Sequence, residues 1–378
     1  MTVIGTRPQF IQAAVLSREI AHRRVVGEPI EERLIHTGQH FDENMSDVFF
    51  REMEIPRPSH HLGIAGGGHG QMTGRMLEAI EQVLLEEKPD WVQVYGDTNS
   101  TLAGALAAAK LHVPIAHIEA GLRSFNRAMP EELNRVLADH ASDLLFAPTR
   151  AAVENLRREG LPESRIALVG DVMYDAMLFY REKASATSDI AHRLGLEPRG
   201  YVLATVHRAE NTDNPAHLRG IIEGLARIAE SAPVVLPLHP RTRQALDHAG
   251  LLERTNTALR LIDPVGYFDM IQLEAGAVVI ATDSGGVQKE AYFHAVPCIT
   301  LREETEWVEL VEAGANVLAG SDPERIVAAF GTMRDRPIER GALYGDGETA
   351  AKILNRLRTA GSDADDRAGE SPETPGPR

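Results

Sequence analysis

The residues best suited to acid and base chemistry gather between positions 117 and 135, in the stretch HIEAGLRSFNRAMPEELNR. The apolar run at 113–116 predicts a buried strand, so His117 and Glu119 emerge at its carboxyl end, where open α/β sheets hold their ligands. A proline then predicts the first turn of a helix that carries Glu131, whose ionised form the helix dipole favours. We therefore expect chemistry at this point of the chain.

Each of these acids also has a plainer explanation. His117 and Glu119 would share one face if the strand persists, as a metal pair would, but no third ligand has diagnostic spacing, so no metal site is expected. Glu131 could simply stabilise its helix. Asp97 follows a predicted strand at 91–95, and it could cap the next helix or point its carboxylate into the cleft.

Two glycine-containing turns predict contact with an anion. GTRP, with Arg7 as the counter-charge, follows the first predicted strand and opens a helix, although a purely structural turn is an alternative. Ser284, Gly285 and Gly286 follow a strong predicted strand and favour a phosphate cradle over a tight turn capped by the serine. Glu290, one helical turn further on, could reach a ribose hydroxyl. Neither turn is GxGxxG, which weakens a nicotinamide-dependent interpretation.

Two histidines end adjacent predicted strands in the second half. His207 is followed by Arg208, and His239 is followed two positions later by Arg241. A pair of such histidines beside arginines favours an anionic ligand in the cleft.

The composition is that of a globular protein with room for two domains. The chain has 378 residues, of which 43% are hydrophobic and 25% charged, and its formal net charge is −16. That charge argues against broad binding of nucleic acid or anionic membranes. There is no bilayer-length apolar run and no signal-like start, so a cytoplasmic protein is expected. Cys298 is the single cysteine, which excludes an intramolecular disulfide, and it is expected in the core.

Short β-branched runs alternate with longer amphipathic runs along the chain, which predicts parallel sheets and an α/β fold of two Rossmann-like halves facing one cleft. A second series of such units begins after residue 170. The final segment at 361–378 has almost nothing apolar and is expected to be a disordered tail. Strands are predicted at 2–5, 34–38, 91–95, 114–118, 144–147, 201–206, 233–238, 259–262, 277–281 and 297–301. Helices are predicted at 9–22, 71–87, 98–111, 131–141, 218–231, 267–274, 287–294, 307–313 and 323–333.

Several motifs in series resemble those of the non-hydrolysing UDP-N-acetylglucosamine 2-epimerases. They are GTRPQF, TGQHFDENM, YGDTNSTLAG, HIEAGLRSFNRAMPEELNR, TVHRAEN, PLHPRTR and TDSGGVQKEA, and they run in order over nearly the whole chain. The resemblance implies a glycosyltransferase-B-like fold, with a first domain at 1–170, a UDP-binding domain at 171–343, and a last helix at about 344–360 that crosses back to the first domain. It also implies a homodimer, no cofactor, and UDP-N-acetylglucosamine and UDP-N-acetylmannosamine as substrates that supply cell-envelope polysaccharide.

The resemblance carries roles onto individual residues. It implies catalytic carboxylates at Asp97, Glu119 and Glu131, with His207 assisting at the departing diphosphate, and it leaves open which carboxylate removes the proton and which returns it. The positions that match phosphate or ribose contacts of the family are Arg7, Ser284, Gly285, Gly286 and Glu290.

A second, activating UDP-sugar site is implied at Gln39, His40 and His239, but the chain departs from the family pattern nearby. Gln12 stands where a lysine is common after GTRP, which leaves part of the phosphate-side charge unaccounted for. Asn44 and its neighbours differ from the usual bacterial GQHR pattern, so allosteric activation is an open question. The first strand is short, which is compatible with an upstream start codon.

The chemistry follows once that substrate is granted. Carbon C2 carries an acetamido group, so alcohol oxidation cannot epimerise it, whereas elimination of UDP to a 2-acetamidoglucal and re-addition can. This route needs acid and base groups on both faces of the sugar. The alternatives are a UDP-2,3-diacetamido-uronic acid substrate, recognised by an arginine such as Arg123 or Arg127, a hydrolysing epimerase, or a glycosyltransferase or UDP-sugar binder on the same fold.

Overall fold

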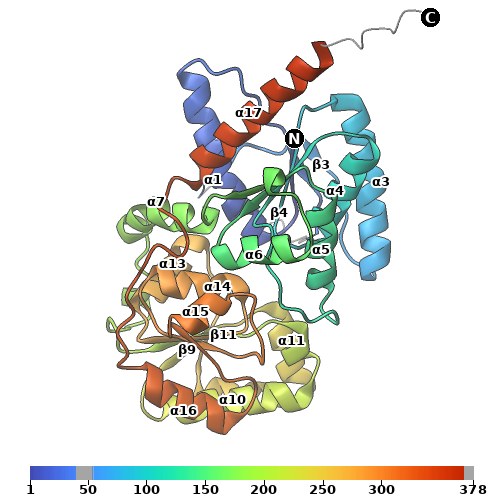
Figure 1. The fold of residues 1–378 in the computed structure, drawn as a ribbon. Helices are drawn as coiled ribbons and strands as arrows, with labels where there is room; N and C mark the ends of the chain where they lie inside the picture. The colour runs from blue at the N-terminus through green and yellow to red at the C-terminus, as the bar shows by residue number, and fades with distance from the viewer. Residues whose placement is uncertain (40–52, 54, 370–378) are drawn as a thin grey trace, which may run out of the picture.

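The computed structural model describes residues 1–39, 53 and 55–369, and of 361–369 only that they belong to a helix. It contains two parallel sheets, one in each half of the chain (Figure 1). The first has seven strands in the order β3-β2-β1-β4-β5-β6-β7, and the second has six in the order β10-β9-β8-β11-β12-β13. Their bounds are β1 Thr2–Ile4, β2 Leu34–His36, β3 His60–His61, β4 Val92–Tyr95, β5 Ile115–Ile118, β6 Leu144–Ala147, β7 Ile166–Leu168, β8 Val202–Thr205, β9 Val234–Pro237, β10 Arg260–Ile262, β11 Val279–Thr282, β12 Cys298–Thr300 and β13 Asn316–Leu318.

Helices cover both faces of each sheet, which is why the central strands are mainly apolar and are buried at every position. Around the first sheet lie α1 Arg7–Val25, α3 His69–Glu87, α4 Asn99–Lys110, α5 Pro130–Ala141, α6 Arg150–Arg158 and the short 3₁₀ helix Glu163–Arg165. Around the second lie α8 Ile190–Arg193, α9 Ala209–Thr212, α10 Pro215–Ala229, α11 Pro240–His248, α12 Leu252–Ala258, α13 Tyr267–Gly276, α14 Gly285–Phe293, α15 Val308–Glu312 and α16 Pro323–Met333. The predicted α/β fold of two Rossmann-like halves is confirmed.

Two helices tie the halves together. Helix α7, Val172–Thr187, packs against α1 and α17 on one side and against α13 and α14 on the other. Helix α17, Thr349–Gly369, lies along α1 in the first half, as Figure 1 shows. The segment that leads into α7 meets the segment that leads into α17 at Gly170. A Cβ at this position would lie 2.9 Å from the carbonyl oxygen of Tyr344, so only glycine fits.

The sequence predicted the central elements better than the marginal ones. All ten predicted strands and nine predicted helices are present, most of them with shifted ends. The elements that were not predicted are the short strands β3, β7 and β13, the helices α6, α7, α8, α9, α11 and α12, and the 3₁₀ helix Glu163–Arg165. Helix α17 continues to Gly369, past the point at which a disordered tail was expected. The rest of the expected tail, 370–378, lies outside the described residues.

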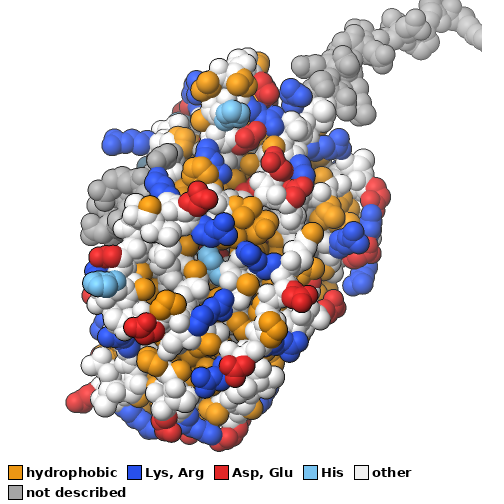
Figure 2. All heavy atoms as spheres, turned by 90° about the vertical axis from the view of Figure 1, so that its left-hand side faces the viewer, with side chains coloured by type: hydrophobic (Ala, Val, Ile, Leu, Met, Phe, Trp, Pro, Cys, Tyr) orange, Lys and Arg blue, Asp and Glu red, His pale blue; other side chains and the backbone are white. Residues whose placement is uncertain are grey.

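Figure 2 shows the face of the molecule on the side of α7 and α13. Positively and negatively charged side chains are intermixed on this face rather than gathered in separate patches. Lysine and arginine alternate there with aspartate and glutamate, and apolar side chains lie between them. Within the described residues, no helix has both the length and the apolar character needed to cross a membrane. Cys298 is buried in the second sheet, as expected for a core residue.

Candidate active site

Strand register brings the predicted site residues together in pairs. In the first sheet Tyr95 at the end of β4 pairs with Ile118 at the end of β5, so the loops that carry Asp97 and Glu119 leave the sheet side by side. In the second sheet Thr205 at the end of β8 pairs with Thr282 at the end of β11, which does the same for the loops of His207 and Ser284. Both pairs lie at carboxyl ends of parallel strands, the place where such sheets bind ligands.

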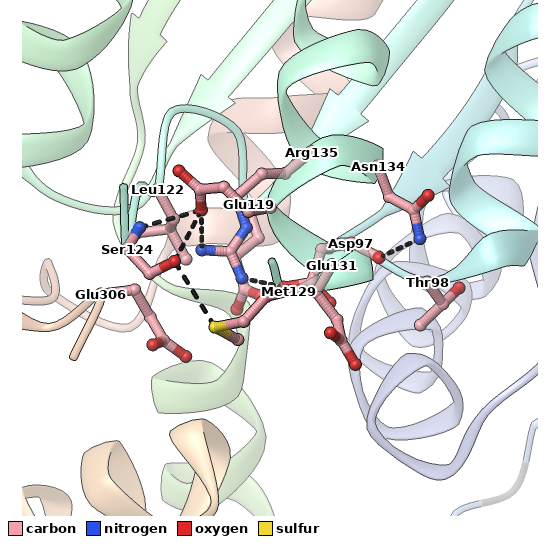
Figure 3. Close-up of polar contacts among 12 residues, drawn as sticks. Asp97, Thr98, Glu119, Leu122, Ser124, Met129, Glu131, Asn134, Arg135 and Glu306 are labelled. Carbon is pink, nitrogen blue, oxygen red and sulfur yellow. Dashed lines mark hydrogen bonds and ion pairs between the residues drawn. The ribbon is translucent and has the colours of Figure 1, made fainter. Parts of the chain in front are cut away.

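Asp97 does not cap helix α4. That position belongs to Thr98, whose hydroxyl accepts a hydrogen bond from the amide of Thr101. The carboxylate of Asp97 instead forms an ion pair with the buried guanidinium of Arg135, and its backbone oxygen accepts from the side chain of Asn134 at 2.9 Å (Figure 3). Two residues of α5 therefore hold Asp97 beside the loop of Glu119.

Glu119 lies one residue beyond β5, which ends at Ile118 as predicted, and has left-handed backbone conformation with φ +70°. The condition under which Glu119 and His117 would share one face of the strand is therefore not met. The turn directs its carboxylate toward Gly96, where a Cβ would lie 3.4 Å from Glu119 Oε1. Its other oxygen, Oε2, accepts from Gln12 Nε2 at 3.1 Å and from Lys289 Nζ at 2.7 Å. Burial raises the pKa of Glu119, and Lys289 opposes that rise.

The neighbouring acids of α5 have different environments. Glu131 is 35% exposed and lies 3.5 Å from the guanidinium of Arg208, which belongs to the second half of the chain. Glu132 is buried and accepts hydrogen bonds from the amides of Ser124 and Phe125, so it fixes the loop that leads into α5. Only the first of the pair is placed to meet a ligand.

His117 and Arg123, both prominent in the sequence, are structural. His117 is fully buried, with Nδ1 at 2.7 Å from Asp139 and Nε2 at 2.7 Å from the backbone oxygen of Gly96. Burial opposes the ionisation of Asp139, but His117 and Arg123 outweigh it and hold the pKa of Asp139 below its usual range. Arg123 also pairs with Glu159 at 2.7 Å, and it is buried, so it is not available to a substrate carboxylate.

Asp283 organises the loop that presents His207. It is fully buried and accepts hydrogen bonds from the amides of His207 and Arg208 and from the side chain of Asn211, at 3.0 to 3.1 Å. Burial lowers the pKa of His207, and the arginines at 208, 7 and 241 lower it further against the pull of Asp283. A histidine surrounded by arginines is suited to a dianionic ligand, whose charge would reverse that effect.

The turn before α14 has free space on one side only. Ser284 occupies the N-cap position, but its side chain makes no capping hydrogen bond within the described part of the chain. A Cβ on Gly285 would lie 2.4 Å from Glu306 Oε1, whereas a Cβ on Gly286 would meet only Ser284 Oγ, at 3.9 Å. The helix N-terminus therefore offers its amides on the open side, as an anion site requires.

Glu290 lies within a buried acidic pair. Burial raises the pKa of Glu290, and burial together with the negative charge of Glu290 raises the pKa of Glu274 well above its usual range. Arg7 acts on both groups and on His207, which places its charge at the junction of the two halves. The carboxylate of Glu290 is thus buried and lies within the electrostatic influence of Arg7.

Two of the three residues expected at a second UDP-sugar site are described. Gln39 Oε1 accepts from the amide and the hydroxyl of Ser100, and Gln39 Cβ lies 3.2 Å from the Cβ position of Gly5. His239 is the N-cap of α11, and its ring lies 5.6 Å from that of His207 between centroids. His40 lies outside the described residues, so the second site stays a prediction.

The sequence did not single out four residues that matter at this site: Arg135, Asp283, Lys289 and Glu306. Glu306 pairs with Arg302 at 3.0 Å, and although burial opposes it, Arg302, Arg135 and Arg208 lower its pKa to about 2. Figure 3 draws it facing the Asp97 and Glu131 group from the other half. Lys289 and Asp283 lie inside the motif TDSGGVQKEA, which was the one indication in the sequence that they matter. Their partners are distant in sequence, so the motif does not predict the contacts that they make.

No group of three or more histidine, cysteine, aspartate or glutamate side chains suited to a metal ion occurs among the residues that the structure describes. A hollow of about 660 Å³ lies at α11, α12 and β10, and it contains none of the predicted site residues.

Comparisons with known proteins show the family to which the chain belongs. The family model for UDP-N-acetylglucosamine 2-epimerase matches residues 24–358. The chain is 53% identical over 361 residues to the UDP-2,3-diacetamido-2,3-dideoxy-D-glucuronate 2-epimerase of Pseudomonas aeruginosa, covering 94% of this chain and 98% of the relative.

Solved structures are similar over the same length. The UDP-GlcNAc 2-epimerase of Methanocaldococcus jannaschii, in complex with UDP-GlcNAc and UDP, has a TM-score of 0.90 and 43% identity, covering 95% of this chain and 99% of that one. The enzyme of Neisseria meningitidis bound to UDP-GlcNAc has a TM-score of 0.86 and 30% identity, covering 95% and 99%. These similarities extend over both sheets and the site between them.

Proposed function

Because the chain belongs to the UDP-N-acetylglucosamine 2-epimerase family, we propose that it interconverts UDP-N-acetylglucosamine and UDP-N-acetylmannosamine without net hydrolysis. The observation that carries the proposal is the group of three carboxylates, Asp97, Glu119 and Glu131, beside Arg208 of the other half. A protein that only binds an anionic UDP-sugar would gain nothing from three acids at this point.

The proposed reaction begins with departure of UDP from C1 and removal of the proton on C2. The C1–O bond breaks with its electrons going to the diphosphate, and the C2–H electrons form the C1–C2 double bond of a 2-acetamidoglucal. UDP then adds back to C1 while a proton returns to the opposite face of C2. One carboxylate must therefore accept a proton on one face and another must donate on the other.

The charges around the carboxylates suit this exchange. Glu119 contacts Lys289, Asp97 contacts Arg135, and Glu131 contacts Arg208, so each acid has a cationic partner. None of the three is buried without a partner. We assign the proton transfers at C2 to Glu119 and Glu131. Asp97 would orient these two carboxylates or relay a proton between them.

The second half is proposed to hold the nucleotide. The amides at Gly285 and Gly286 and the side chain of Arg7 would contact the diphosphate, and Glu290 the ribose. His207 lies among three arginines, where it would donate to the departing diphosphate. Restraint of UDP here is what allows the same molecule to add back rather than diffuse away.

A second candidate substrate is a UDP-2,3-diacetamido-uronic acid, because the relative named for that substrate is 53% identical and the Methanocaldococcus jannaschii relative 44%. Such a sugar carries a carboxylate that needs a cation. Arg123 is buried in ion pairs, whereas Arg127 is exposed on the loop between Glu119 and Glu131. Arg127 is therefore the side chain we propose for that contact.

One experiment tests both candidates. Purified protein is incubated in deuterated water with either UDP-sugar, without added NAD or metal, and C2 is followed by NMR. Epimerisation predicts deuterium at C2 and two intact UDP-sugars, and the substrate with the larger kcat/KM is the physiological one. Release of free sugar would establish hydrolysis instead, and an inert pair of substrates would contradict the proposal.

The proposal includes a division into domains at 1–170 and 171–343, with the closing helix returning to the first domain. The change of sheet at this boundary and the packing of α17 on α1 support the division. The family resemblance also leads us to propose a homodimer, which sedimentation measurements would test.

A further inference from the structure

Lys289, on α14, is a buried cation between two carboxylates. Its side chain is 2% exposed, and Nζ lies 2.7 Å from Glu119 Oε2 and 2.6 Å from Asp171 Oδ2. The ammonium also lies 4.3 Å from the centre of the Trp307 ring. Burial alone would lower the pKa of Lys289, but Asp171 and Glu119 outweigh it, so the ammonium remains charged.

The two carboxylates have different duties. Asp171 accepts a hydrogen bond from the amide of Met173 at 2.7 Å and so caps α7, the helix that packs on both halves. Glu119 has no such structural task and belongs to the proposed proton-transfer group. Lys289 therefore links a fixed point of the fold to a carboxylate that has to be placed for chemistry.

A second donor reaches the same atom of Glu119. Gln12 Nε2, from α1, donates to Oε2 at 3.1 Å, so both donors engage one oxygen. The other oxygen, Oε1, lies at Gly96, next to the loop of Asp97. Because both donors engage Oε2, Oε1 remains on the side where the sugar is proposed to bind.

We propose that Lys289 is a positioning residue for the epimerisation: it keeps Glu119 ionised and fixes it through Oε2, so that Oε1 faces the substrate. The inference rests on the proposed function, since it assigns a task to a residue of that site. Glu119 itself would touch the sugar, whereas Lys289 acts through it.

The surroundings explain why the cation is needed. Burial raises the pKa of Glu119, and the negative charges of Asp171 and Asp97 raise it further, while Lys289 lowers it. The other acids near Lys289 are Glu290 on its own helix and Glu309 on α15, which add negative charge and no counter-charge. Without Lys289, Glu119 would be protonated over more of the neutral range.

The first test is Lys289→Met, which keeps the length of the side chain and removes the charge. We expect kcat/KM at neutral pH to fall about tenfold or more, with affinity for UDP nearly unchanged. The pH–rate limb that reports Glu119 should move upward by about one unit or more.

The matched control is Lys352→Met. Lys352 also forms an ion pair, with Asp346 at 2.7 Å, but it is 40% exposed and lies on α17, so this variant should keep the wild-type pH profile. If Lys289→Met is unstable, Lys289→Met with Asp171→Asn removes the buried charge that would be left unpaired, and the same shift is expected.

The decisive variant moves the positive charge beside Glu119 from position 289 to position 12. Because Gln12 and Lys289 reach the same oxygen, Gln12→Lys combined with Lys289→Gln should return the limb toward its wild-type position and restore part of the rate. Gln12→Lys alone should move the limb downward.

A folded, UDP-binding Lys289→Met enzyme with the wild-type pH profile would overturn the inference, as would a folded exchange variant with no recovery. Either outcome would leave the proposed function intact, because that function fails only if the wild-type protein leaves both UDP-sugars without deuterium at C2 or releases free sugar.

Discussion

The two edges of the site hold their charged groups in opposite ways. On the edge of the first sheet, Asp97, Glu119 and Glu131 each contact the cationic side chain of an arginine or lysine. On the edge of the second sheet, the central carboxylate is Asp283, which is fully buried and accepts mainly from backbone amides.

The difference separates chemistry from binding. Side-chain ion pairs allow a carboxylate to gain or lose a proton while its partner adjusts, which suits proton transfer at a sugar. A carboxylate fixed by backbone amides, as Asp283 is, sets the shape of the loop that carries His207 and Arg208. The first edge should therefore control turnover, and the second should control nucleotide affinity.

The largest predicted effect is on the first edge. Glu119→Gln and Glu131→Gln each keep the shape of the side chain but remove its proton chemistry, so each should lower kcat by about 100-fold or more. Affinity for UDP, measured by calorimetry, should change by less than about threefold, because the second edge is untouched. The control is Glu86→Gln, an exposed residue near the end of α3, which should match the wild type.

Near-normal turnover in either variant would remove that residue from the mechanism. A loss of UDP affinity as large as the loss of turnover would show that the two edges do not divide the work.

A change of intermediate size is predicted on the second edge. Gly286→Ala has room for its Cβ, since only Ser284 Oγ lies nearby, at 3.9 Å. If phosphate oxygens approach these amides, the methyl group should weaken UDP binding by about tenfold while the melting temperature is retained.

Gly285→Ala provides the contrast, because its Cβ would lie 2.4 Å from Glu306 Oε1. It should lower the melting temperature as well as the affinity. Unchanged UDP affinity in a folded Gly286→Ala protein would contradict the phosphate cradle.

The smallest predicted effect is a pH dependence of substrate binding at His207. Burial and the arginines at 208, 7 and 241 lower the pKa of His207, so the free imidazole is largely neutral at pH 7. A bound diphosphate adds negative charge and raises that pKa, so binding takes up a proton and strengthens as pH falls.

Calorimetry with UDP-N-acetylglucosamine and the Glu131→Gln variant, which should not turn over, would measure this between pH 7.5 and 6. We expect affinity to rise by about threefold. Adding His207→Asn to this variant should abolish the dependence of affinity on pH. An equal dependence with and without His207→Asn would mean that another group takes up the proton on binding.

The sequence alone was enough to predict the fold and the family. The alternation of short β-branched and longer amphipathic runs predicted both parallel sheets, because the period of apolar residues is set by local geometry. Strand ends such as Tyr95-Gly96-Asp97 and Thr205-Val206-His207 predicted which loops would carry the site, since parallel strands place all such ends at one edge.

Only the tertiary structure decided what each charged residue does. His117 and Arg123 looked as functional in sequence as Glu119, yet both are buried in ion pairs around Asp139. Lys289 showed no role in sequence, yet it contacts Glu119, 170 positions away along the chain. Charge interactions depend on distance and burial in three dimensions, and neither is encoded in local spacing, so partners on different sheets are known only once the chain has folded.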